Sequence, residues 1–329
     1  MNKRPLIFEE QISRKPDHYA FCQEFISAMW AGHWTPNEFN FKSDVHDFKT
    51  KLTDQEKAII EKTLSAVGQI EVAVKKFWAK MPDTLKHPSL ADLGYTMANI
   101  EVIHNIAYEK LLTSLDLNKV FEENLKLEII QGRVKYLRKY LEKNYDDEKK
   151  QYIYALILFT LFVENVSLFS QFYTILWFGR FKNVLKDTNQ QVLYTKNEEL
   201  IHAQAGIKLI QTIQQEYPEL FDEDLKNKII SEAKEAFNSE SKIIDWMIGD
   251  YSDKRINAKI VKEYVKWKIN DSLKQIGFGE IYEINDDLYR DFEWMNEEVL
   301  GNNMTDFFYK RPVDYSKKHT NFDAANLFD

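Results

Sequence analysis

The chain contains the pattern Glu-x-x-His twice, and this repetition constrains the fold more than any other feature. The first copy runs from Glu101 to His104 in IEVIHNIAY, and the second from Glu199 to His202 in NEELIHAQA. Both copies lie in helical patterns of apolar residues, and residues three apart on a helix point to the same side. Each copy can therefore hold one metal ion, and the two together predict two helices that face a common buried site.

A further acidic residue precedes each copy in an apolar stretch of sequence. Glu71 lies in VGQIEVAV, before the first copy, and Glu164 lies in LFVENVSLF, before the second. An isolated buried charge is very unfavourable, so we expect both carboxylates to bind metal. Four carboxylates and two neutral imidazoles balance the charge of two divalent ions. Oxygen and nitrogen ligands without thiolate favour manganese or iron over zinc or copper(I).

The composition predicts an all-α protein. Glycine and proline number only 10 and 7 in 329 residues, whereas strands and tight turns need more of both. Apolar residues recur at three- and four-residue spacing, and Thr53 to Glu56 form a capping box that begins a helix. We expect residues 1–52 to be irregular apart from one helix, and Pro82 and His87-Pro88 to break the chain. The predicted helices cover approximately 17–31, 53–80, 89–115, 121–143, 187–215, 223–248, 257–276 and 285–298.

Residues 155–179 are apolar except for the charge of Glu164, and by length they could cross a membrane. A carboxylate at midspan is costly in lipid, and Asn165 and Gln171 add further polar groups. We therefore favour a helix that is buried on all sides in a large bundle, and we expect no membrane association.

Charge and cysteine content exclude several classes of protein. The net charge is 44 − 52 = −8, and general nucleic-acid binding requires a basic face instead. A single cysteine, Cys22, excludes internal disulfides and Cys-x-x-Cys zinc sites. The low cysteine content indicates a reducing, cytoplasmic compartment, and the N-terminal MNKRPLIFEEQ has no signal-peptide pattern.

The order acid, helix, Glu-x-x-His occurs twice, and it is typical of ferritin-like helical bundles with a dinuclear metal–carboxylate site in the core. Such bundles include iron stores, desaturases, monooxygenases and radical generators, so the fold alone does not select a function.

Three further features narrow the choice. Tyr108 lies one turn beyond His104 on the same helical face. The segment HWTPNEFNFKSDVHDF begins at residue 33 and contains Trp34, and the C-terminal segment DFFYKRPVDYSKKHTNFDAANLFD contains Tyr315. In these features, from about Trp34 to the C-terminus, the chain resembles the radical-generating small subunit of class I ribonucleotide reductase.

The resemblance implies a function for each candidate residue. The implied ligands of two metal ions are Glu71, Glu101, His104, Glu164, Glu199 and His202. Tyr108 would occupy the radical-tyrosine position. A radical relay would run through Trp34, Glu198 and Tyr315 to a catalytic large subunit that reduces ribonucleotides. We expect Leu168 and Phe172 to form an apolar wall beside the metals.

The resemblance also predicts the domain organisation. Residues 1–310 would form the radical-generating domain, which pairs as a homodimer. Residues 311–329 would form a flexible tail that docks on the large subunit.

The sequence departs from the common pattern of this family at two positions. Glu71 stands where the iron–tyrosyl members have Asp, and glutamate at this position is associated with manganese-containing members. Glu198 likewise replaces an Asp. We therefore favour a dimanganese centre, with di-iron and a Tyr108 radical as the alternative and a mixed manganese–iron centre third.

Two rival functions use the same fold. One is a ligand-binding oxidase or monooxygenase that acts on a small apolar substrate, and the other is a store or scavenger of iron. Neither has a use for Tyr315 or for the terminal segment.

Overall fold

The computed structural model describes residues 4–300, without the side chains of 71–74 and 297–300. Within residues 4–300 every regular element is helical, and the only β-type pairing is an isolated bridge between Asp253 and Ile256. The all-α prediction is confirmed. The α-helices are α1 (Phe21–Ala31), α2 (Lys42–Thr50), α3 (Asp54–Thr84), α4 (Pro88–Ser114), α5 (Asn118–Asn124), α6 (Glu128–Leu137), α7 (Glu148–Ile157), α8 (Phe169–Trp177), α9 (Lys186–Glu216), α10 (Glu223–Ile248), α11 (Ala258–Gln275) and α12 (Asp286–Leu300).

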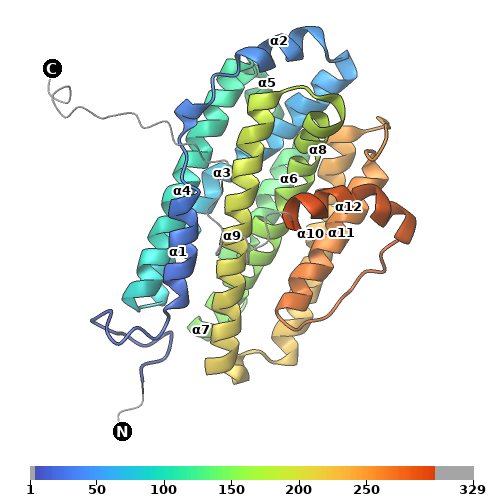
Figure 1. Ribbon diagram of the computed structural model, residues 1–329. Helices are drawn as coiled ribbons and strands as arrows, with labels where there is room; N and C mark the ends of the chain where they lie inside the picture. The colour runs from blue at the N-terminus through green and yellow to red at the C-terminus, as the bar shows by residue number, and fades with distance from the viewer. Residues whose placement is uncertain (1–3, 301–329) are drawn as a thin grey trace, which may run out of the picture.

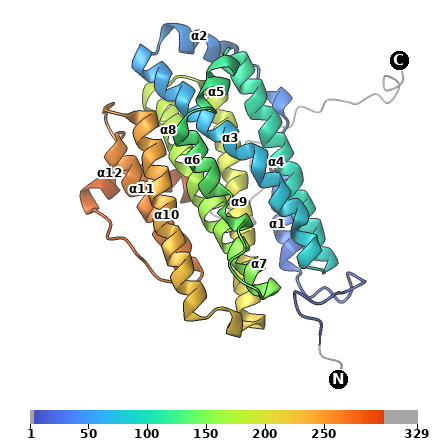
Figure 2. The ribbon, with the colours of Figure 1, turned by 180° about the vertical axis from the view of Figure 1, so that it is seen from behind.

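Four long helical segments form the centre of the bundle (Figures 1 and 2). They are α3, α4, α9 and a continuous apolar rod over residues 148–182, which joins α7 and α8 through the π-helix η3 (Leu158–Ser167) and ends in a second π-helix, η4 (Phe178–Lys182). Helix α3 packs along α4, and α9 packs against η3 and α8. Helices α10 and α11 cover the rod from outside, and α12 packs on α11 (Figure 1).

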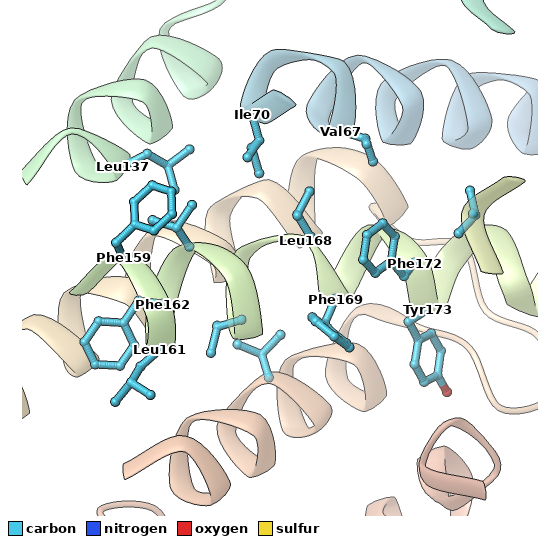
Figure 3. Packing of buried hydrophobic residues seen from close by; sticks show 14 of the residues in the cluster. Val67, Ile70, Leu137, Phe159, Leu161, Phe162, Leu168, Phe169, Phe172 and Tyr173 are labelled. Atoms are coloured by element: carbon cyan, nitrogen blue, oxygen red, sulfur yellow. The ribbon is translucent and has the colours of Figure 1, made fainter. Parts of the chain in front are cut away.

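The apolar rod is a core helix, as expected from its polar residues. In its most apolar window 94% of the residues are buried inside the protein. Figure 3 shows side chains of the rod projecting both toward α3, where Val67 and Ile70 lie, and toward the opposite side. Burial on both sides explains why the composition of the segment resembles that of a membrane span.

Helix α9 approaches the rod closely because of one glycine. A Cβ atom at Gly206 would clash with the side chain of Thr160 in η3. Gly206 follows His202 by one turn. The absence of a side chain there therefore allows two segments that carry predicted metal ligands to pack together.

Several predicted boundaries were wrong. The helix expected over 121–143 is divided into α5, α6 and the 3-10 turn η2 (Lys139–Leu141). Residues 1–52 contain a second helix, α2, and Pro82 does not break α3, which continues to Thr84. The capping box at Thr53 is confirmed, because Thr53 N donates to Glu56 Oε2 at 2.9 Å and Glu56 N donates to Thr53 Oγ1 at 3.3 Å.

Candidate metal centre

Three segments bring five of the six predicted ligands together in the middle of the bundle. Glu101 and His104 come from α4, Glu164 from η3, and Glu199 and His202 from α9. All five side chains are fully buried. One ligand atom from each of Glu101, Glu164, Glu199 and His202 lies within 4.8 Å of the others.

The two carboxylates of the Glu-x-x-His pairs lie between the two imidazoles. His104 Nδ1 is 3.4 Å from Glu101 Oε2 and 3.0 Å from Glu199 Oε1. His202 Nδ1 is 2.8 Å from Glu101 Oε1 and 3.3 Å from Glu199 Oε2. Each carboxylate thus presents one oxygen to each imidazole, which is the arrangement expected of ligands that bridge two metal positions.

The donor atoms of this cluster fit a metal centre better than a hydrogen-bonded network. Within the described part of the chain, both oxygens of Glu101 and Glu199, both ring nitrogens of His202, and Glu164 Oε2 make no hydrogen bond, although several lie close together. Buried polar atoms without partners are costly. Two divalent cations would satisfy these atoms and neutralise the carboxylates, and oxygen and imidazole ligands suit manganese and iron.

The same crowding shifts the ionisation of the cluster. Burial would lower the pKa of His202, but its contacts with Glu101 and Glu199 outweigh burial and raise the pKa to about 9. Burial and the nearby charges of Glu199 and Glu101 raise the pKa of Glu164 well above its ordinary value. For Glu199, contacts with Glu164 and the two histidines outweigh burial, so its pKa falls. Protons and metal ions therefore compete for this site.

A hydrogen-bonded chain leads from His104 to a buried tryptophan. His104 Nε2 lies 2.7 Å from Glu198 Oε2, and Trp34 Nε1 donates to the same oxygen at 2.8 Å. The Trp34 ring is fully buried and stacks near His104, with centroids 6.2 Å apart and planes at 23°. The structure thus brings Trp34 and Glu198, which the sequence singles out separately, to the same edge of the cluster.

A second tryptophan contacts the cluster through a different carboxylate, and the sequence reasoning missed it. Trp78, on α3, is fully buried and donates from Nε1 to Glu164 Oε1 at 2.6 Å. Its ring centroid lies 6.5 Å from that of His202. Its spacing of seven residues from Glu71, about two helical turns, was the available signal.

The segment that follows Trp34 is attached to the start of α9 by carboxylates, which the sequence reasoning also missed. Asp44 Oδ2 accepts hydrogen bonds from Thr188 N at 2.6 Å and Thr188 Oγ1 at 2.7 Å. In return, Asp187 Oδ2 accepts from Phe41 N at 2.9 Å and Asn40 N at 3.2 Å. These bonds fix the Trp34 segment to the helix that carries Glu198 and Glu199.

The remaining predicted residues are distributed as follows. Tyr108 is buried on α4, one turn beyond His104. Leu168 and Phe172 are fully buried and project toward α3 (Figure 3). The backbone of Glu71 lies in α3, its side chain is outside the description, and Tyr315 lies outside the described residues.

The helical bundle and its convergent Glu–His cluster define a ferritin-like protein with a dinuclear metal–carboxylate site. Residues 11–288 match the family described as ribonucleotide reductase, small chain. The chain therefore belongs to this family and is the small subunit of a class I ribonucleotide reductase, an oxidoreductase.

Individual relatives agree with this assignment. The chain is 22% identical over 326 residues to a probable ribonucleoside-diphosphate reductase small subunit of Invertebrate iridescent virus 3, covering 94% of this chain and 86% of the relative. A putative class I ribonucleotide reductase from Bacillus halodurans matches with a TM-score of 0.77 and 21% identity, covering 85% and 100%. The dimanganese(II) protein NrdF of Streptococcus sanguinis matches with a TM-score of 0.71 and 14% identity, covering 85% and 96%. At these identities the two structures support the fold alone.

Proposed function

We propose that this subunit oxidises a pair of metal ions in the Glu–His cluster and passes the oxidising equivalent to a large subunit. The observation that carries the proposal is the hydrogen-bonded chain from His104 through Glu198 to Trp34. The chain starts at the imidazole of His104, a predicted metal ligand, and ends at the indole of Trp34, which can be oxidised. When bound, the metals supply the oxidising power, and the protein supplies binding, orientation and exclusion of water.

Different residues of this chain would bind the metals, relay the radical and exclude water. The two Glu-x-x-His pairs hold the metals, with Glu164 and the predicted ligand Glu71 completing the set. Glu198 accepts the indole proton of Trp34 in a hydrogen bond and holds the His104 ring, so that electron and proton movements are coupled at one carboxylate. From Trp34 the relay would continue to Tyr315 and then to the large subunit. Leu168 and Phe172 would keep the site dry.

We favour manganese over iron for this centre. Glutamate at position 71, which is associated with manganese-containing members of the family, supports this choice. With manganese, the metal pair would store the oxidising equivalent and Tyr108 would be a bystander. With iron, Tyr108 would carry the radical, and a mixed manganese–iron centre is the third alternative.

The assembly would contain two copies of this chain and the large subunit. Tyr95, Val102 and Ile106 form an exposed apolar stripe along one face of α4, with 57%, 41% and 50% of their surfaces exposed, and Trp30 of α1 is 61% exposed. An apolar face of this kind suits a homodimer interface, which sedimentation velocity can test.

Residues 311–329 would form the tail that docks on the large subunit in the cytoplasm, and a synthetic peptide of these residues should compete for that subunit.

The test loads the protein separately with manganese and with iron, exposes it to oxygen or superoxide, and records the electron paramagnetic resonance spectrum together with turnover. A many-line manganese-coupled signal that supports turnover with the large subunit would establish manganese. A narrow organic radical with iron, lost in Tyr108→Phe, would establish the tyrosyl alternative. Oxidation of a small apolar compound without any large subunit would instead support the ligand-binding oxidase.

A further inference from the structure

Aromatic side chains form a continuous group from the Glu164 edge of the metal centre to the surface. Trp78 is in contact with two phenylalanine rings, Phe159 of η3 at 5.3 Å and Phe77 of α3 at 5.1 Å between centroids. Both rings reach Tyr140 of η2, at 5.3 Å from Phe159 and 5.4 Å from Phe77. The two phenylalanines stack on each other at 4.0 Å and 15°.

The order of side chains along this group is chemically meaningful. Indole and phenol are the aromatic side chains that lose an electron most easily, and here they occupy the two ends. Trp78 is fully buried and hydrogen-bonded to the carboxylate of Glu164, which favours loss of an electron from the indole. Tyr140 is partly exposed, so its phenol proton can pass to water. The phenylalanine rings between them exclude water and fill the space through which an electron would pass from one end to the other.

Packing alone does not require these two residue types. Phenylalanine or leucine can fill a buried position equally well, and neither brings a polar group into the core. The indole N–H of Trp78 is directed to a ligand of the proposed metal centre, and Tyr140 lies where the ring group reaches solvent. This edge of the cluster is distinct from the one that holds Trp34, His104 and Glu198.

We propose that Trp78 and Tyr140 form a second electron route, which discharges the oxidised centre to small reductants at the surface when no large subunit accepts the oxidising equivalent. The proposal rests on the proposed function, because it requires an oxidised centre. Such a route protects the ligands, since an oxidant held in a closed pocket otherwise attacks the side chains around it.

The electron balance is simple. Trp78 gives one electron to the centre and keeps its N–H in the hydrogen bond to Glu164. Tyr140 gives one electron to the oxidised indole and releases its phenol proton to water. A one-electron reductant such as ascorbate then returns an electron to the tyrosyl radical, and water returns the proton. No covalent bond forms or breaks except the O–H bond of Tyr140, which is broken and restored.

Tyr140→Phe is the decisive variant, because it keeps the ring stack and leaves Trp78 and its contact with Glu164 unchanged. Tyr145→Phe is the matched control, since Tyr145 is also partly exposed but packs against Tyr154. In metal-loaded, oxidised protein without large subunit, we expect ascorbate to bleach the spectroscopic signal of the centre about ten-fold more slowly in Tyr140→Phe than in the control.

A flash experiment tests the route without metal. A ruthenium photo-oxidant is attached through Lys143→Cys, because the Lys143 side chain is 74% exposed and the single native cysteine, Cys22, is fully buried. After the flash we expect a tryptophanyl radical that is absent in Trp78→Phe and that decays as a tyrosyl radical appears. This decay should be about ten-fold slower in Tyr140→Phe and unchanged in Tyr145→Phe.

The outcomes separate this proposal from the proposed function. No tryptophanyl radical in either the parent chain or Tyr140→Phe, or an equal decay rate in the two, overturns the route even if the subunit supports turnover. A tryptophanyl radical whose decay depends on Tyr140 supports the route as built, even if the centre proves to have another use.

Discussion

The two tryptophans beside the metal centre are attached to it in different ways. Trp34 binds Glu198, which among the described side chains contacts the cluster through the imidazole of His104. Trp78 binds Glu164, which is itself one of the convergent carboxylates. The first attachment adds a proton-accepting group between indole and ligand, so it suits controlled, proton-coupled transfer. The second attachment is direct, so a change at Trp78 acts on the ligand itself.

Trp34→Phe gives the largest expected effect. The phenylalanine ring fits the buried site but removes the indole N–H and the oxidisable group, so turnover with the large subunit should fall by roughly a thousand-fold while metal content is unchanged. Steady-state assays and metal analysis of the same sample check this. Tyr315→Phe should behave in the same way, and normal turnover in either variant would rule out the relay.

Trp78→Phe should act on the metals rather than on the relay. It leaves Glu164 Oε1 without its hydrogen-bond donor, and loss of such a partner behind a ligand typically costs about ten-fold or more in metal affinity. Competition with a chelator measures this affinity. Turnover at saturating metal should stay within a few-fold of the parent chain. If Trp34→Phe weakened metal binding more than Trp78→Phe did, the contrast between the two attachments would be wrong.

The sequence predicted the parts of the site that depend on local spacing. Residues three apart on a helix share a face whatever surrounds them, which is why the Glu-x-x-His pairs of α4 and α9 converge as expected. The capping box at Thr53 is local in the same sense and was also predicted.

The parts that depend on tertiary packing could not be predicted in this way. The π-helix that carries Glu164 has no periodicity of its own in the sequence. Its last carbonyl, that of Ser167, accepts a hydrogen bond from Arg133 of α6, a contact between segments that are distant in the chain. The bonds between Asp44 and Thr188 join segments that are far apart in the chain. Likewise, the break between α5 and α6 interrupts a pattern that reads as one helix.

The smallest expected effect concerns a buried lysine on the Glu164 side of the centre. Lys268 of α11 is only 3% exposed and donates from Nζ to Asn165 Oδ1 at 2.6 Å, next to Glu164 in the chain. Its ammonium group lies 3.8 Å from the centroid of the Phe169 ring, and no described carboxylate is within ion-pair distance. Burial lowers the pKa of Lys268 to about 8.

The lowered pKa means that the charged form of Lys268 destabilises the fold. A fall in the pKa from 10.5 to about 8 corresponds to a destabilisation of the fold by roughly 3 kcal/mol. This penalty is fully present below pH 8 and disappears as the pH rises toward 10.5. Lys268→Met removes this penalty but leaves Asn165 Oδ1 without its donor, at a cost of about 1–3 kcal/mol. The variant should therefore be about 1 kcal/mol more stable than the parent chain near pH 7 and less stable near pH 10.

Urea unfolding at both pH values measures this difference. Lys274→Met is the control, because Lys274 lies on the same helix with 70% of its side chain exposed, and its substitution should change stability little at either pH. A difference for Lys268→Met that did not vary with pH would mean that the pKa of Lys268 is the same in the folded and the unfolded chain. Burial of the Lys268 ammonium group would then carry no penalty, and the asymmetry between the two edges of the centre would lie in the tryptophan contacts alone.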